Sequence, residues 1–448
     1  MYPRFATRVP VVFFVLLLST QARAEKNAQV EAPPESLTLE ELEQMALAQN
    51  PTLALAEAAL RSAAGRTLQA GLYPNPIMGY LGEELSLRAP SKTSEHLFFM
   101  EQAIVTAGKL KHSRSVSAQK EKELEADAEA QRHRVLNAVR MFYYEALGAQ
   151  QMLELRTRLA EVARGADTTS QQLLNVGAAD RPDVLEAQIE LDQSEIELVR
   201  AENDLGRAWL MLAAVVGEPT MERPQLQGDL EGQWPVFERD ALLADLLRAS
   251  PELKRAQAGV ERARAMLQRA KAEPVPDILL RGGIGYNNEF SEFLGEVGPE
   301  AFIEVGFRVP LFDRNQGNVA AAQAEIDGAG HEVRRLELEL RTRMAMAYDQ
   351  YSDAFALAER YQKRVLPRAQ EAYELYLGRF REMGAAYPQV LIAQRTLFQV
   401  RADYVESLVD LWQNGVLIRG MLLAGGLEPA LSAAPTGATE GAPGHLKE

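Results

Sequence analysis

The chain repeats itself at a spacing of about 200 residues, and this repeat constrains its fold more than any other feature. The matched segments are 50–53 with 250–253, 74–76 with 274–276, 177–179 with 384–386, 184–188 with 390–394, and 218–219 with 428–429. Solenoid units are only about 20–50 residues long. The repeat therefore indicates a duplicated half-protein, and one architecture has to explain both halves.

The first 24 residues have the pattern of a secretory signal. Arg4 and Arg8 precede a short apolar run over 11–18, and Ala22-Arg23-Ala24 has the A-x-A form of a cleavage site. The run is too short to span a bilayer; a buried strand is the alternative. Cleavage after Ala24 removes three arginines and no acid, so the charge would change from −15 to −18 (−15 − 3). We predict a signal peptide over 1–24 and an exported protein.

The composition excludes several classes of function. The 448 residues include no cysteine, so disulfides, thiolate metal sites, cysteine nucleophiles and a lipid-anchored N-terminal cysteine are excluded. An acidic chain repels phosphates, so we expect no nucleic-acid partner. Abundant Ala, Leu, Glu, Arg and Gln are typical of helices and coiled coils. No segment after the signal approaches the 18 apolar residues of a transmembrane helix.

Both halves are predicted to have the same order of elements, namely helix, β-hairpin, very long helix, turn and helix. The fold class is mainly α with a small β part. The expected divisions after the signal are an N-terminal segment over 25–38, a first repeat over 39–218, a connector over 219–236, a second repeat over 237–428 and a disordered tail over 429–448. The first repeat has its hairpin at 77–105 and its helical tip at 175–183. The second repeat has its hairpin at 277–310 and its helical tip at 381–389.

The helices and strands can be placed from proline positions and periodicity. Helices are expected over 39–70, 109–175, 182–216, 239–272, 318–382 and 388–423, with breaks at Pro51 and Pro251 after the N-cap candidates Asn50 and Ser250. Strands are expected over 77–87, 95–105, 277–287 and 300–310. The long helices would each be roughly 100 Å in length. Such helices indicate a rod or a tube instead of a compact globule.

Alternation in the second hairpin predicts one apolar and one polar face. Ile303, Val305, Phe307 and Val309 share one face and Glu304, Gly306 and Arg308 the other. In the preceding strand, Leu280, Ile284 and Tyr286 lie on one side and Arg281 on the other. The first hairpin alternates less cleanly.

The last helix of each half has an unbroken heptad seam. The first seam is Val184, Ala187, Leu191, Ser194, Leu198, Ala201, Leu205, Ala208, Leu212 and Val215; the second is Val390, Ala393, Leu397, Val400, Tyr404, Ser407, Leu411, Asn414, Ile418 and Met421. An ordinary amphipathic core helix is the alternative. The sustained register in both halves favours a coiled coil.

Together these elements predict an outer-membrane channel. Four strands do not close a barrel, and an open sheet edge is not tolerated in lipid, so several chains have to contribute to one barrel. Strands of about ten residues fit an outer-membrane span. The long helices would extend away from the barrel as a periplasmic tube.

The chain resembles the TolC family of outer-membrane efflux proteins (outer-membrane factors) over nearly its whole mature length. The resemblance depends on the duplicated Asn/Ser-Pro-x-Leu helix starts, Pro74-Asn75-Pro76, the strand ends 104–109 and 310–313, and the two tip motifs. It implies a homotrimer with a 12-stranded barrel, continued by an α-helical coiled-coil barrel in the periplasm. The implied location is the outer membrane of a Gram-negative-type bacterium, with the barrel in contact with outer-membrane lipid.

The resemblance also implies partners and a function. The helical tunnel would dock on a periplasmic adaptor (membrane fusion protein) and an inner-membrane pump, which is expected to be of the RND type. Pro74-Asn75-Pro76 and Gly108-Lys109 are most similar to the heavy-metal-efflux (CzcC-like) branch. The cargo would then be heavy-metal cations, which the channel conducts passively from periplasm to exterior. Drug efflux and type I protein secretion remain alternatives, and a secreted coiled-coil structural or adaptor protein without a pore is the alternative of another class.

The resemblance places the functional residues at the two helical tips. The implied adaptor-docking motif consists of Gly177, Val184, Leu185, Gly384, Val390 and Leu391, and the gate candidates are Asp180, Asp183, Glu186, Arg381, Glu382 and Gln389. Family members have acids beside the Val-Leu of the second tip. Here those positions are the uncharged Gln389 and Ile392, and the acids lie at the first tip.

Two readings of the charged tip residues stay open. Asp180, Asp183 and Glu186 would form a cation-selecting carboxylate ring if three chains meet. The aspartates would alternatively cap a helix N-terminus. Arg379, Arg381 and Glu382 would either form gate-locking ion pairs or belong to a solvated surface.

No residues point to catalysis. The five histidines, at 96, 112, 133, 331 and 445, are not clustered as metal ligands, and the glycines at 282, 283 and 285 lie within a strand instead of a nucleotide-binding loop. P-loop, zinc-protease and nucleophile-elbow motifs are absent from the sequence. We therefore expect no enzyme activity, no cofactor and no bound metal site.

Overall fold

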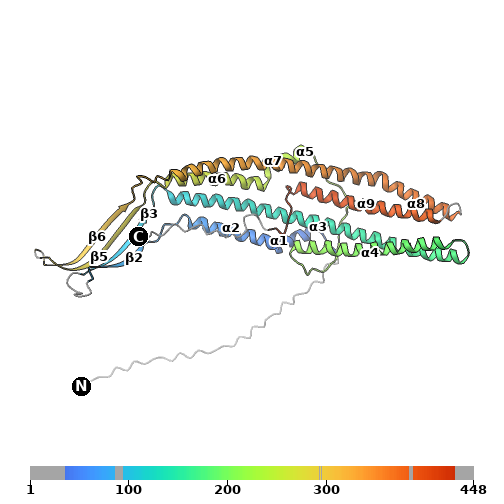
Figure 1. Ribbon diagram of the computed structural model, residues 1–448, viewed down its shortest axis with the longest axis horizontal. Coiled ribbons are helices and arrows are strands. Elements are labelled where there is room, and N and C mark those ends of the chain that lie inside the picture. Colours follow the sequence, from blue (N-terminus) through green and yellow to red (C-terminus); the bar gives the residue numbers. More distant parts are fainter. Residues whose placement is uncertain (1–35, 86–93, 292, 294, 383–386, 429–448) are drawn as a thin grey trace, which may run out of the picture.

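The computed structural model describes residues 36–85, 94–291, 293, 295–382 and 387–428. The predicted signal peptide, the predicted tail and the tip residue Gly384 lie outside these residues. The protein is elongated, with a β-sheet at one end and two helical tips at the other (Figure 1).

Each half begins with two helices that meet at a proline, as predicted. They are α1 (Leu39–Gln49) and α2 (Pro51–Gln69), and α5 (Arg239–Ala249) and α6 (Pro251–Ala272). The Asn50 carboxamide caps α2 by accepting a hydrogen bond of 2.9 Å from the amide of Thr52. Ser250 is the N-cap residue of α6, as predicted, but its side chain makes no cap hydrogen bond.

The long helix of the first half agrees with its prediction, whereas that of the second half is interrupted. The first half contains α3 (Lys109–Asn175) and α4 (Arg181–Val216); the second contains α7 (Gln316–Arg360), a π-helical turn (Tyr361–Val365), α8 (Leu366–Arg381) and α9 (Tyr387–Arg419). The interruption has a physical cause in Pro367, which donates no backbone hydrogen bond and whose ring crowds the carbonyl four residues earlier. The amide of Leu366 accordingly bonds to the carbonyl of Tyr361, five residues back.

Four antiparallel strands form one sheet in the order β2-β3-β5-β6. They are β2 (Ile77–Glu83), β3 (Glu95–Ile104), β5 (Ile278–Ser291) and β6 (Gly295–Phe307). The second hairpin extends further toward its loop than predicted, with a register shift between Asn287 and Phe290, and ends before Arg308 and Val309. The pairing of β3 with β5 joins the two halves. A short parallel pair, β1 (Ser36–Leu37) with β4 (Gln225–Leu226), was not predicted.

The core lies around the middle of the molecule, where the two halves meet. One cluster includes Tyr143, Leu147, Leu212 and Leu408 from α3, α4 and α9. Buried polar groups fix the chain after α9 to α3, because the Asn137 carboxamide donates to the carbonyls of Gly420 and Leu423 at 2.8 and 2.7 Å. Every residue of the two predicted seams is buried or half-buried, so the seams are the packed faces of α4 and α9, although Met421 lies beyond the end of α9. In the described parts of the chain, none of the helices is both long and apolar enough to cross a membrane.

Candidate channel and periplasmic tips

The strand register gives the sheet one continuous apolar face. Directly opposed residues share a face, so Met78 with Met100, Tyr80 with Phe98, and Leu280 with Val305 lie on the same side. The large apolar residues of this face are Met78, Tyr80, Phe98, Met100, Ile104, Ile278, Leu280, Ile284, Tyr286, Ile303, Val305 and Phe307. They are highly exposed, up to 82% for Ile303. The predicted alternation of the second hairpin is therefore confirmed for the residues within the strands, whereas Arg308 and Val309 lie beyond the end of β6.

The opposite face carries the charges. Over residues 77–83, 95–104, 278–287 and 298–307, the Glu and Arg residues all lie on this side, whereas His96 lies on the apolar face; the Glu and Arg residues are Glu83, Glu95, Glu101, Arg281, Glu300 and Glu304. Leu97 on this face is only 7% exposed, whereas its neighbour Phe98 on the apolar face is 64% exposed. Side chains crowd together on the inside of a curved sheet and spread apart on the outside. The charged face is therefore the concave one.

Within the chain, the outer edges of the sheet have no partner strand. Among the described strands, β2 pairs with β3 alone and β6 with β5 alone. An unpaired edge exposes backbone amides and carbonyls that can bond to another chain. The sheet is thus a curved segment, with an apolar outside, a charged inside and two edges available for pairing.

The first tip is built from two matched helix caps. Gly177, with a φ of 76°, ends α3 in a Schellman motif in which the Ala178 amide bonds to the Leu173 carbonyl at 2.8 Å. At the start of α4, the Asp180 carboxylate accepts from the Asp183 amide at 3.2 Å, and the Asp183 carboxylate accepts from the Asp180 amide at 3.1 Å. This capping box confirms the helix-cap interpretation of both aspartates.

The tip motif combines buried and exposed residues. Val184 and Val390 are 7% and 3% exposed, whereas Leu185 is 48% exposed and Leu391 is half-buried. Glu186, Arg381, Glu382 and Gln389 are exposed. The valines therefore hold each pair of helices together, and the exposed residues are available to another molecule.

Two further features lie on the tip helices, an apolar groove and an ion pair. An apolar groove of about 250 Å³ lies between α8 and α9, and its lining includes Tyr376, Gln389 and Ile392. Arg395 of α9 approaches Glu190 of α4, with 3.7 Å between Nη1 and Oε2. The arginine is exposed and the glutamate is half-buried, so this single ion pair between α4 and α9 contributes little stability.

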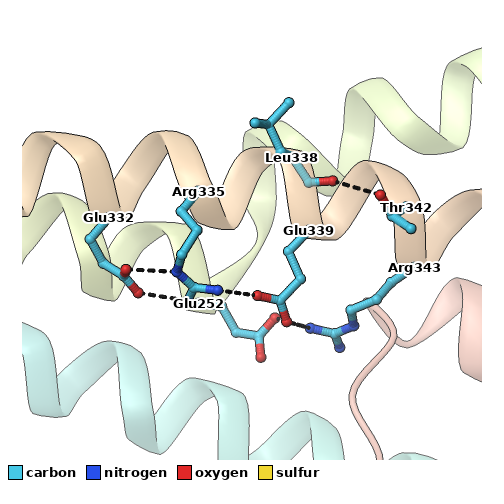
Figure 2. Close-up of polar contacts among 7 residues, drawn as sticks. All are labelled: Glu252, Glu332, Arg335, Leu338, Glu339, Thr342 and Arg343. Carbon is cyan, nitrogen blue, oxygen red and sulfur yellow. Dashed lines mark hydrogen bonds and ion pairs between the residues drawn. The ribbon is translucent and has the colours of Figure 1, made fainter.

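The helical wall near the sheet contains a charged groove of about 660 Å³ between α3, α6 and α7. Figure 2 shows the ion pairs along α7, where Arg335 joins Glu332 and Glu339, each at 2.7 Å, and Arg343 reaches Glu252 of α6 at 3.0 Å. The Arg335 hydrogen bond lowers the pKa of Glu332 below its usual value. A wall of paired charges is suited to contact with water.

The sequence did not reveal the surroundings of Arg281. Its guanidinium carbon lies 4.0 Å from the centre of the Phe99 ring and 5.8 Å from that of Phe302. A side chain at Gly79 or Gly283 would overlap the rings of Phe99 and Phe302, respectively. The glycines within the strands were the available signal, but Arg281, Phe99 and Phe302 come from three different strands. In the described residues no group of three or more His, Asp or Glu side chains could hold a metal ion.

The sequence profile of the outer membrane efflux protein family matches this chain twice, over residues 42–218 and 242–419. These two stretches correspond to the two halves of the duplication. The chain is 29% identical over 387 residues to the cobalt-zinc-cadmium resistance protein CzcC of Cupriavidus metallidurans, covering 86% of this chain and 90% of the relative. The family is one of channel proteins and not of enzymes.

Solved structures of outer-membrane channels share the fold. The channel OprN superposes with a TM-score of 0.71 at 18% identity, covering 87% of this chain and 91% of OprN. CusC gives 0.70 at 17% identity, covering 86% and 92%, and VceC of Vibrio cholerae gives 0.68 at 19% identity, covering 87% and 97%. With its duplicated halves, amphipathic sheet and long paired helices, this chain belongs to the outer membrane efflux protein family.

Proposed function

We propose that three copies of this chain form a channel that conducts divalent metal cations across the outer membrane. The observation that carries the proposal is the four-stranded sheet, which has an apolar convex face, a charged concave face and two unpaired edges. Pairing β6 of one copy with β2 of the next would satisfy both edges, and three copies would supply twelve strands. The apolar face would contact lipid and the charged face would line the lumen.

The proposed cargo is supported by chemistry and by similarity. Five carboxylates and one guanidinium lie on the charged face within the strand segments given above, and such a lining attracts cations. The relative CzcC is described as a cobalt-zinc-cadmium resistance protein. Passive conduction requires no bound metal site, so the cations would pass through instead of being stored.

Efflux channels of this family work with an adaptor and an inner-membrane pump. We propose a periplasmic adaptor that docks at the two tips, and a pump of the RND type. The exposed Leu185, half-buried Leu391 and the apolar groove beside Gln389 and Ile392 would supply the docking contacts. The acids of the first tip, Asp183 and Glu186, would attract cations at the entrance while Asp183 also caps its helix.

The test combines conductance with metal accumulation in cells. The purified mature chain should form ion-conducting channels in planar bilayers. Deleting its gene in the source bacterium should raise cellular Zn²⁺, Co²⁺ or Cd²⁺ under metal load, and re-expression should reverse the change. Channels without any effect on metal content would contradict the metal cargo, and an absence of channels would contradict the pore itself.

A further inference from the structure

Arg281 occupies a distinctive position on the concave face of the sheet. The register places it in one row across the strands, between Glu101 of β3 and Glu304 of β6. Its Nη1 lies 3.8 Å from the Glu304 Oε2, and its side chain is only 25% exposed. Two carboxylates and one guanidinium therefore share this row of the sheet, and we refer to the position of the row along the strands as its level.

Aromatic rings fix the arginine against the sheet. The guanidinium lies over the Phe99 ring at 4.0 Å, and the Phe302 ring is 5.8 Å away. Both phenylalanines belong to the next row toward the hairpin loops, together with Gly79 and Gly283, which leave room for their rings. The positive charge is therefore held at one level of the wall instead of moving freely in solvent.

The charge balance makes this level unlike the rest of the concave face. On this face, over residues 77–83, 95–104, 278–287 and 298–307, Arg281 is the one basic residue, and it shares the face with five acids. A channel conducts an ion well only if the ion binds strongly enough to enter and weakly enough to leave. Without the guanidinium, each chain would present two unpaired carboxylates at this level, which would retain a divalent cation.

We propose that Arg281 determines the ion selectivity of the lumen by limiting how strongly its level of carboxylates retains divalent cations. This inference rests on the proposed trimeric channel, because it needs the concave face to line a lumen. Glu304 and Glu101 supply the attraction, Arg281 offsets it, and Phe99 with Phe302 holds the guanidinium in place.

The experiment measures single channels of the full mature protein in planar bilayers, with a KCl gradient and with added Zn²⁺. Arg281→Gln should shift the reversal potential toward that of a more cation-selective channel. It should also lower the Zn²⁺ concentration for half-maximal block about tenfold, because three fixed positive charges leave one level of the lumen. Arg281→Lys should keep the wild-type values, because it keeps the charge.

The charge-matched control is Arg314→Gln, which removes an exposed arginine from the turn after β6, outside the sheet. It should leave selectivity and block unchanged. The double variant Arg281→Gln, Glu304→Gln restores the net charge of the row and should return both values toward wild type. If Arg281→Gln does not assemble, Glu304→Gln alone carries the test, and it should make the channel less cation-selective.

Open Arg281→Gln channels with unchanged reversal potential and Zn²⁺ block would overturn the inference while leaving the proposed channel intact. An equal shift in Arg314→Gln would also overturn it, because the effect would then be a general one of net charge. A wild-type protein that forms no channels would instead contradict the proposed function.

Discussion

Lys109 and Asp277 join the two halves of the protein at the level where the sheet gives way to the helices. The Lys109 Nζ lies 3.1 Å from the Asp277 Oδ1, and only 11% of the lysine side chain is exposed. The same carboxylate oxygen accepts a hydrogen bond of 2.9 Å from the Thr106 amide. The first residue of α3 is thereby attached to the residue that precedes β5.

Asp277→Asn is expected to destabilise this junction by about 1–3 kcal/mol, because a largely buried ammonium loses its charged acceptor. Thermal unfolding of the purified protein in detergent would measure the loss. Asp313→Asn is the matched control, because Asp313 is a nearby aspartate that is exposed. Its side chain accepts a hydrogen bond from the Asn315 amide, and an asparagine side chain can accept the same hydrogen bond. Equal melting temperatures for Asp277→Asn and wild type would show that the ion pair contributes nothing measurable.

Val305→Arg is expected to impair assembly in the membrane, at a cost of about 2–4 kcal/mol if the residue lies near the bilayer midplane. Val305 is on the apolar face and 61% exposed in the single chain. The yield of folded protein in outer-membrane fractions would report the effect. Glu304→Gln, on the neighbouring residue of the concave face, should assemble normally; the opposite ranking of the two variants would mean that the sheet faces the other way.

Asp183→Asn together with Glu186→Gln is expected to weaken cation selectivity and block by multivalent cations added from the tip side. An asparagine at position 183 can still accept from the Asp180 amide, so the helix cap should persist. Single-channel recordings would show the change. Glu202→Gln removes an exposed acid of α4 away from the tip and serves as the control. Unchanged selectivity in the double variant would leave these acids as helix caps alone.

His133 is expected to make the protein less stable in mild acid. Burial lowers its pKa below 6.5, and this effect outweighs the opposing charge of Glu129; Arg140 and Lys254 lower it further. The unfolded chain therefore binds the proton more readily, so stability is present above pH 6.5 and is lost as the pH falls through the folded pKa.

Thermal unfolding of His133→Gln should accordingly show a smaller decrease between pH 7.5 and pH 5.5 than wild type. The exposed His331 of α7 provides the control, because His331→Gln should follow the wild-type pH profile. An identical decrease in wild type and His133→Gln would assign the acid sensitivity to other groups.

The duplicated prolines and heptad seams predicted most of the helices because both signals are local. Pro51 and Pro251 determine where helices begin, and the seam from Val184 or Val390 determines which face is buried. Pro367 was equally visible, yet the surrounding helical pattern continued through it, so the π-helical turn was missed.

The sheet could be predicted only in part, because its contacts are not local. The alternation around Val305 revealed two faces, but β2 places Ile77 and Leu81 on the charged face and so obscured the pattern there. The pairing of β3 with β5 joins residues that lie far apart in sequence, such as Glu101 and Arg281. The setting of Arg281 depends on that pairing and therefore became visible only in three dimensions.

The most direct test of the proposed channel is the native mass of the mature protein purified in detergent. Pairing β6 with β2 of another copy requires more than one chain, and the twelve strands of the proposed barrel require three. We predict a mass of three chains, with the strand content retained in circular dichroism. A stable monomer that keeps its full strand content would contradict the proposal, because its sheet edges would then need no partner.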